Sequence, residues 1–191
     1  AFPCRSLWCS ATLRPEWLRT VDFAPRLSSL VTASLQEDDL AYARVRQRTH
    51  SRKALVPLAP KSLVKAVVEH HSPGTLTLVI RNTVKEAVAT YKVVVKKAKG
   101  VPAVLLHSRF RPQERKEILS RALSVPGEKG LILVTTQVVE AGVDISASAL
   151  FTDLAPWSSL VQRFGRCNRA GELDNARIFW LNEVPSEKKA L

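Results

Sequence analysis

Along most of the chain, short apolar runs alternate with segments in which apolar residues recur every three or four positions. The runs are typical of buried strands, and the wider spacing is typical of helices that bury one face. The pattern predicts helices at 62–71, 83–98, 112–124 and 158–168, a short helical turn ending at Gly142, and strands at 75–81, 102–107, 130–135, 148–152 and 176–181. This alternation indicates an α/β fold, with a mostly parallel sheet flanked by helices on both faces.

The segment 83–98 carries the clearest helical pattern. Thr83 and Glu86 have the spacing of a capping box at its start, and Gly100 follows its end. Its apolar stripe consists of Val84, Ala87, Val88, Tyr91, Val94, Val95 and Ala98. We therefore expect this helix to bury one face.

The first 60 residues are less regular. Residues 4–13 read as a short buried strand that runs into a polar turn, whereas turn residues interrupt the pattern from 22 to 60. We expect residues 1–20 to end one domain, 21–60 to connect two domains and 61–191 to form the second. The chain contains no methionine, even at position 1, which suggests a fragment of a longer protein.

The chain is strongly basic. Its 191 residues include 29 Lys and Arg against 17 Asp and Glu, a formal net charge of +12, and 46% are apolar, enough for one complete core. The charge indicates a polyanionic partner, nucleic acid before acidic lipid. Because no apolar run is long enough to span a membrane and no signal-peptide pattern is present, we expect neither membrane insertion nor secretion.

The cysteines indicate neither a disulfide framework nor a metal site. There are three, Cys4, Cys9 and Cys167, and none belongs to a CxxC pair. We expect reduced thiols in a cytoplasmic protein and no metal site, with Cys167 as a small space-filling residue.

The segment 162–171, with the sequence QRFGRCNRAG, groups three arginines. If it is helical, with about 100° per residue, Arg166 and Arg169 return to the face of Gln162. The opposite face would carry Leu160, Val161 and Phe164. Two planar guanidinium groups side by side suit the γ-phosphate of a nucleotide, and the alternative is a solvated basic helix.

Polar clusters follow three of the predicted strands. They are Asn82 and Thr83 after the first, His107, Ser108 and Arg109 after the second, and Thr135, Thr136 and Gln137 after the third. The carboxyl ends of parallel strands meet at one edge of a sheet, where ligands bind. Hydroxyl, amide and backbone N–H groups there can hold a nucleic-acid phosphate without reading a base. The alternatives are a helix cap at Thr83 and an ordinary surface turn at His107.

Asp144 follows Gly142 and Val143 in a chain that contains many arginines. It is either an ion-pair partner or an acceptor for a ribose hydroxyl, with Gly142 letting the backbone approach. A nucleoside triphosphatase also needs a GxxxxGK[ST] loop and a strand-end carboxylate for Mg²⁺, and none of the seven glycines begins such a loop.

Four segments in order resemble motifs of superfamily 2 helicases. SATL, LVIRNT, VTTQVVEAGVD and QRFGRCNRAG look like motifs III, IV, V and VI. The form of the last two is similar to the CRISPR-associated helicase-nuclease of type I interference. The resemblance implies a second RecA-like domain, preceded by the short tail of a first, in a protein that translocates along single-stranded DNA by hydrolysing ATP.

The resemblance also implies roles for individual residues. Arg166 and Arg169 would be arginine fingers, Gln162 would position the nucleotide and the attacking water, and Gly142, Asp144 and Arg163 would contact the nucleotide. Thr135, Thr136 and Gln137 would grip the strand, with Asn82, Thr83, His107, Ser108 and Arg109 beside them. Ser10 and Thr12 would couple the nucleotide state to domain movement.

ATP with Mg²⁺ would be bound mainly by the first RecA-like domain. The implied partners are single-stranded DNA, that N-terminal RecA-like domain, a nuclease domain and a CRISPR RNA-guided surveillance complex. Because motifs I and II are absent from the sequence, we expect this chain alone to be inactive. The alternatives are another superfamily 2 DNA or RNA helicase and a stand-alone basic nucleic-acid-binding module.

Overall fold

The structure is a computed structural model, which describes residues 19–20, 24–29, 31, 53–124, 127–140 and 142–182. The chain divides into two compact units, residues 1–41 and 42–191. Within the first unit, the described part includes a 3-10 helix, η2 (Ala24–Ser29). The expected strand over 4–13, with Ser10 and Thr12, lies outside the described residues.

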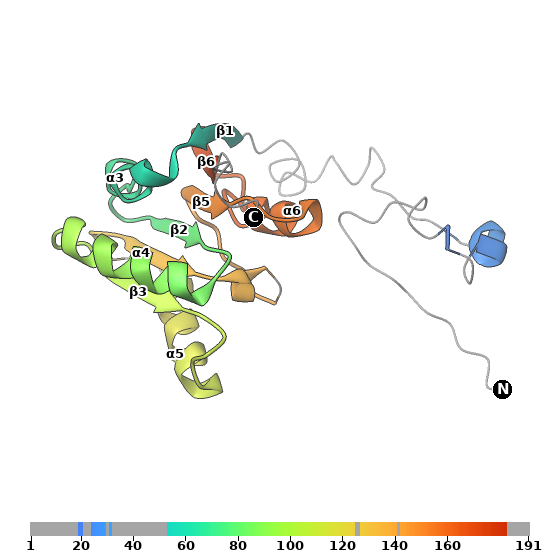
Figure 1. The fold of residues 1–191 in the computed structure, drawn as a ribbon, viewed down its shortest axis with the longest axis horizontal. Helices are drawn as coiled ribbons and strands as arrows, with labels where there is room; N and C mark the ends of the chain where they lie inside the picture. Colours follow the sequence, from blue (N-terminus) through green and yellow to red (C-terminus); the bar gives the residue numbers. More distant parts are fainter. Residues whose placement is uncertain are drawn as a thin grey trace, which may run out of the picture. The chain divides into compact units, whose positions relative to one another are not determined.

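The second unit is built on a sheet of six parallel strands (Figure 1). The strands are β1 (Lys53–Leu58), β2 (Leu76–Ile80), β3 (Ala103–Leu106), β4 (Leu131–Thr135), β5 (Ala149–Asp153) and β6 (Ala176–Leu181), in the spatial order β1-β6-β5-β2-β4-β3. The helices are α3 (Leu63–Glu69), α4 (Val84–Lys97), α5 (Pro112–Leu123) and α6 (Trp157–Phe164), with the 3-10 turns η3 (Pro60–Ser62) and η4 (Gln137–Val139). The predicted parallel α/β architecture is confirmed.

Two hydrophobic cores lie on opposite faces of this sheet. Side chains of α3 and α4 pack on one face, against Val79 and Phe151 among others. Residues of α5 and Phe164 of α6 pack on the other, against Leu78 and Ile80. Figure 1 shows α4 and α5 on opposite sides of β3. Alternate residues of β2 therefore face different cores, which explains why this strand reads as a continuous apolar run.

The start of α4 matches its sequence signal. The Thr83 hydroxyl accepts a hydrogen bond from the backbone N–H of Glu86 at 3.2 Å, which satisfies one of the free donors of the first helical turn. The helix buries Ala87 and Val94 against the sheet. The predicted N-cap is confirmed.

Two expectations about elements were wrong. Residues 53–58, assigned to the connection 21–60, form strand β1, which pairs with β6 from Lys53 opposite Ala176 to Leu58 opposite Leu181. An edge strand tolerates Pro57 and half-exposed side chains, so its pattern resembles a loop. The helix expected over 158–168 ends at Phe164.

Candidate nucleotide and nucleic-acid interface

Arg163 is the centre of a buried hydrogen-bond network. Its residue surface is 2% exposed. Its Nε donates to Glu140 Oε1 at 2.8 Å, Nη1 donates to Thr152 Oγ1 at 2.9 Å and to the Asp153 carbonyl at 3.2 Å, and Nη2 donates to Asn82 Oδ1 at 3.1 Å. One side chain thus joins α6 to the ends of β2 and β5 and to the segment after β4.

The expected contact of Arg163 with a nucleotide stays a prediction, and four hydrogen bonds hold its guanidinium inside the domain. This network was not predicted, because the helical pattern alone does not show which acceptors surround a basic side chain. Glu140 and Thr152, which hold it, were not predicted as site residues, since an isolated Glu and Thr carry no recognisable signal.

Asp153 holds the turn after β2 through hydrogen bonds to its carboxylate. Its Oδ2 accepts from Arg81 Nε at 2.9 Å and from the backbone N–H of Asn82 at 2.7 Å. Asn82 Nδ2 in turn donates to the Leu154 carbonyl at 2.7 Å. The amide group of Asn82 is therefore held on both sides, by Arg163 at Oδ1 and by the Leu154 carbonyl at Nδ2. These hydrogen bonds join the turn after β2 to the carboxyl end of β5.

The other nucleic-acid candidates lie at the same edge but differ in access. Thr135 and Thr136 are buried, and the Thr135 hydroxyl donates to the Thr136 carbonyl at 3.2 Å. Gln137, the first residue of η4, is exposed. Contact of the two threonines with a strand stays a prediction, with Thr135 the last residue of the central strand β4 and Thr136 the residue before η4.

The turn after β3 holds the remaining candidates. The His107 ring stacks on Phe110 with ring centroids 4.3 Å apart, while Ser108 and Arg109 are exposed. Within the described part of the chain, the buried Nδ1 of His107 has no hydrogen-bond partner. An unpaired buried nitrogen carries a desolvation cost, which an incoming ligand group could offset.

Arg166 lies in a turn beyond α6, not on the helix. Its Nε donates to the Val139 carbonyl at 3.0 Å and its Nη2 to the Glu140 carbonyl at 2.6 Å. Burial, together with the charge of nearby Arg169, lowers the pKa of the Arg166 guanidinium from its ordinary value. The helix ends at Phe164, and beyond it Cys167 pairs with Ala147 and Asn168 has φ 44°.

Arg169 and Asp144 form an accessible ion pair beside Arg166. Arg169 Nε contacts Asp144 Oδ1, and the two side chains are 41% and 79% exposed. The backbone N–H of Arg169 donates to Ser146 Oγ at 3.0 Å, which fixes the start of this side chain. Gly142 has φ +70°, with open space where a side chain would begin, so both its conformation and its surroundings let a ligand approach.

The structure thus brings Arg166, Arg169 and Asp144 together, but not on one helix as the sequence pattern predicts. The turn 165–169 and the segments 139–140 and 142–146 hold them. Gln162 is exposed on α6. Glu140 connects the two regions, since its carboxylate binds Arg163 and its carbonyl binds Arg166.

Cys167 is a packing residue. Burial raises the pKa of its thiol to about 11, although Lys53 opposes this rise. Its Sγ donates to the Arg177 carbonyl at 3.6 Å. Lys53 Nζ donates to the Phe164 carbonyl at 3.1 Å and so caps the end of α6. A thiol that stays protonated at neutral pH is a poor nucleophile.

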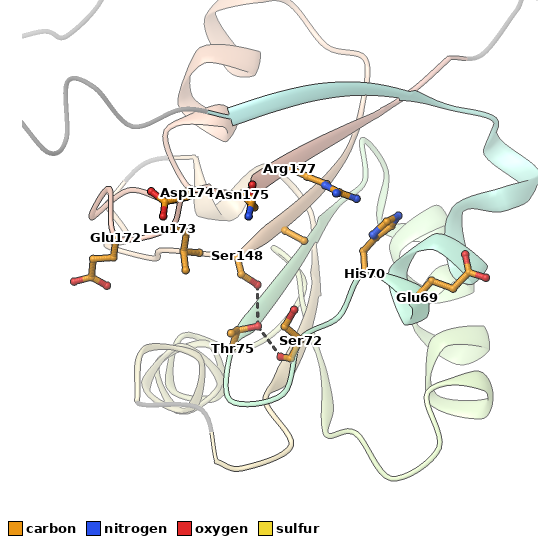
Figure 2. A pocket seen from close by; sticks show the side chains of 11 residues that line it. Glu69, His70, Ser72, Thr75, Ser148, Glu172, Leu173, Asp174, Asn175 and Arg177 are labelled. Atoms are coloured by element: carbon orange, nitrogen blue, oxygen red, sulfur yellow. Dashed lines mark hydrogen bonds between the residues drawn. The ribbon is translucent and has the colours of Figure 1, made fainter.

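A hollow of about 560 Å³ lies at the opposite edge of the sheet (Figure 2). It is lined by residues that precede β2, β5 and β6, including Thr75, Ser148 and Asn175. The Thr75 hydroxyl bonds the Ser148 hydroxyl at 2.8 Å and the Ser72 carbonyl at 2.7 Å. None of the predicted site residues lines this hollow, so we do not assign it to the nucleotide.

In the part of the chain that the structure describes, no helix is long and apolar enough to cross a membrane. Within the same residues, no group of three or more His, Cys, Asp or Glu side chains is arranged to hold a metal ion.

Comparison with known proteins gives consistent matches. The family described as CRISPR-associated nuclease/helicase Cas3, C-terminal, matches residues 73–172. The CRISPR-associated nuclease/helicase Cas3 of Haloferax volcanii is 46% identical over 87 residues, which are 44% of this chain and 9% of that protein. The CRISPR-associated helicase Cas3 of Thermoproteus tenax is 36% identical over 122 residues, 62% of this chain and 20% of that protein.

Solved structures agree with the sequence matches. T. fusca Cas3 in its ADP form superimposes with a TM-score of 0.60 at 26% identity, covering 73% of this chain and 19% of that one. The C-terminal domain of the DEAD-box protein Dbp5 has a TM-score of 0.51 at 19% identity and covers 70% of this chain and 77% of that one, a likeness of fold alone. Since the family match covers just over half of the sequence, the chain belongs to the C-terminal domain family of the CRISPR-associated nuclease/helicase Cas3, among the superfamily 2 helicases.

Proposed function

We propose that this chain is the second RecA-like motor domain of an ATP-dependent translocase that acts on single-stranded DNA in CRISPR interference. Arg166 and Arg169 would complete an ATP site whose other half belongs to a preceding RecA-like domain, of which residues 1–20 would be the end. The observation that supports this most is the pairing of an anchored arginine, Arg166, with the exposed ion pair of Arg169 and Asp144.

The accessible groups fit a nucleotide. Arg169 is half-exposed and contacts Asp144 through Nε, while Arg166 beside it is anchored to two carbonyls, and guanidinium groups suit a transferring phosphate. The exposed Asp144 carboxylate can accept a ribose hydroxyl, and Gly142 leaves room for the sugar. ATP, ADP and AMPPNP forms of T. fusca Cas3 support the assignment. Mg²⁺ would accompany ATP and be held mainly by the preceding domain.

Glu140 would connect nucleotide state to the DNA edge. Closure of the cleft onto ATP would shift Arg166, whose Nη2 is bonded to the Glu140 carbonyl. The Glu140 carboxylate holds Arg163, and Arg163 holds Asn82 at the end of β2. Movement at the arginines would therefore reach Asn82, Gln137 and Arg109 at the carboxyl edge, which would contact phosphates of the strand.

The intact protein would work with other domains and partners. The curated relatives are much longer than this chain, which spans 9% and 20% of the two described above. A structure titled CRISPR RNA-guided surveillance complex, pre-nicking, contains a similar chain at 27% identity with a TM-score of 0.55. We propose that the intact protein associates with such a complex and carries a nuclease domain.

The chain by itself is expected to release no phosphate from ATP above background. The reason is that the sequence has no GxxxxGK[ST] loop to hold the β- and γ-phosphates. The measurement is phosphate release by the purified chain with ATP, Mg²⁺ and single-stranded DNA. DNA-stimulated turnover that disappears in Arg166→Ala would contradict the proposal, because it would place a complete ATP site within these residues.

The chain is also expected to bind single-stranded DNA weakly, with little sequence preference and with an affinity that falls steeply as salt rises. The physical reason is that the net charge of +12 and the hydroxyl and amide contacts address phosphates, whose counterions are released on binding. Fluorescence anisotropy with labelled strands of different sequence, at several salt concentrations, measures this. Affinity that is independent of salt, or that is confined to one sequence, would count against it.

A further inference from the structure

The turn between β5 and α6 exposes an unusual apolar surface. Trp157, the first residue of α6, is 65% exposed, and Leu154 is 47% exposed. The residues between them and the two serines that follow Trp157 carry no charge, in a chain with a net charge of +12. Large aromatic side chains usually lie mostly buried, so an exposed tryptophan on a rigid element indicates a binding role.

This surface is held directly beside the proposed path of the DNA strand. The Leu154 carbonyl accepts from Asn82 Nδ2 at 2.7 Å, and the Asp153 carboxylate next to it accepts from the Asn82 N–H at 2.7 Å. Because β5 lies next to β2 in the sheet, Trp157 belongs to the same carboxyl edge as the polar turn after β2. Trp157 is the first residue of α6, so its backbone position is fixed by the start of this helix.

We propose that Trp157, with Leu154 beside it, is a stacking platform for one unpaired base of the single-stranded DNA. The inference rests on the proposed function and extends it, because none of the other candidate contacts addresses a base. The indole offers a broad π-face on which any base can stack, so it adds affinity without sequence preference. Neighbouring amide and hydroxyl groups would hold the adjoining phosphates.

A base fits this surface better than a protein partner does. Stable protein interfaces bury roughly 800 Å² on each side, with a cluster of apolar anchors. Two exposed apolar side chains next to polar turns supply much less than that. The exposed surface of these two side chains suits one flat, uncharged ring. The polar groups around them suit the phosphates of a nucleotide.

The test compares two strands of equal length, one of thymidines and one whose sugar-phosphate units lack bases. Trp157→Ala is expected to lower the affinity for the thymidine strand about tenfold and to leave the affinity for the abasic strand unchanged. The slope of affinity against salt should not change, since stacking releases no counterions. Trp157→Phe should keep most of the affinity.

Val95→Ala is the matched control, because Val95 is 49% exposed on α4 and lies in the last turn of that helix, away from the carboxyl edge. It should bind both strands as the wild-type chain does, and thermal unfolding should show that each variant is folded. Equal affinities of wild-type and Trp157→Ala for the thymidine strand, or an equal loss on both strands, would overturn the stacking site alone. If the wild-type chain binds neither strand, the proposed function fails and the stacking site fails with it.

Discussion

Replacing Arg169 with alanine in the intact two-domain protein is expected to lower ATP turnover about a thousandfold or more, with little change in ATP affinity. In the proposed ATP site, Arg169 would contact the transferring phosphate only when the cleft closes, whereas the preceding domain would supply most ground-state binding. The native state should be little affected, because Arg169 is 41% exposed and its partner Asp144 is 79% exposed, and exposed ion pairs contribute little to stability. Steady-state kcat and KM, with an independent ATP-binding measurement, test this.

Arg166→Ala should reduce turnover similarly but should also destabilise the domain. Arg166 donates to the carbonyls of Val139 and Glu140, and buried acceptors left without donors cost about 1–3 kcal/mol. Lysine should rescue either position poorly, since a compact ammonium cannot reproduce two-pronged contact. Lys97→Ala, which removes an exposed charge on α4, is the control for general electrostatic effects. Near-normal turnover in folded Arg166→Ala and Arg169→Ala proteins would leave the arginines without a catalytic role.

Glu140→Ala is expected to lower the free energy of unfolding by about 3 kcal/mol. The substitution removes the only carboxylate bonded to Arg163, among the residues that the structure describes, and leaves a guanidinium that is 2% exposed without a counter-charge. Glu140→Gln should cost less, about 1 kcal/mol, because the amide oxygen can still accept from Arg163 Nε. Urea unfolding, analysed by linear extrapolation, gives both values.

Glu69→Ala is the matched control for this stability effect. Glu69 also faces a basic side chain, Lys65 at 3.6 Å, but the two side chains are 56% and 78% exposed. Its removal should change the free energy of unfolding by less than about 0.5 kcal/mol. If Glu140→Ala proved equally harmless, the network around Arg163 would contribute nothing to the fold, and its proposed part in connecting the two sites would lose its physical basis.

The elements that bury a full face were predictable from the sequence. Strands β2, β4 and β5 are buried along their whole length, and α4 has both a cap and a stripe, so local pattern and tertiary structure agree. Strand β1 was not recognisable, because it has a neighbour on one side only and its burial alternates irregularly around Pro57. Its identity depends on β6, more than 100 residues later in the chain.

The candidate site was predictable in residue type but not in geometry. The arginines of the segment 162–171 were found by sequence, yet Arg163 points inward and Arg166 lies beyond the helix. The difference arises because an arginine on a basic helix and an arginine inside a network have the same local sequence. Only the acceptors decide which it is, and those of Arg163 come from β2, β5 and the segment after β4.

The bond from Lys53 to the end of α6 has a mechanical consequence. Lys53 is the first residue of β1, so a force that pulls on the chain before Lys53 acts on the sheet at this residue. Because β1 runs parallel to β6 at the sheet edge, a pull along its axis loads all six residue pairs, from Lys53 with Ala176 to Leu58 with Leu181, together in shear. The same pull acts through Lys53 Nζ on the Phe164 carbonyl, two residues before Arg166. In the proposed translocase, such a force would act two residues before Arg166, the proposed arginine finger.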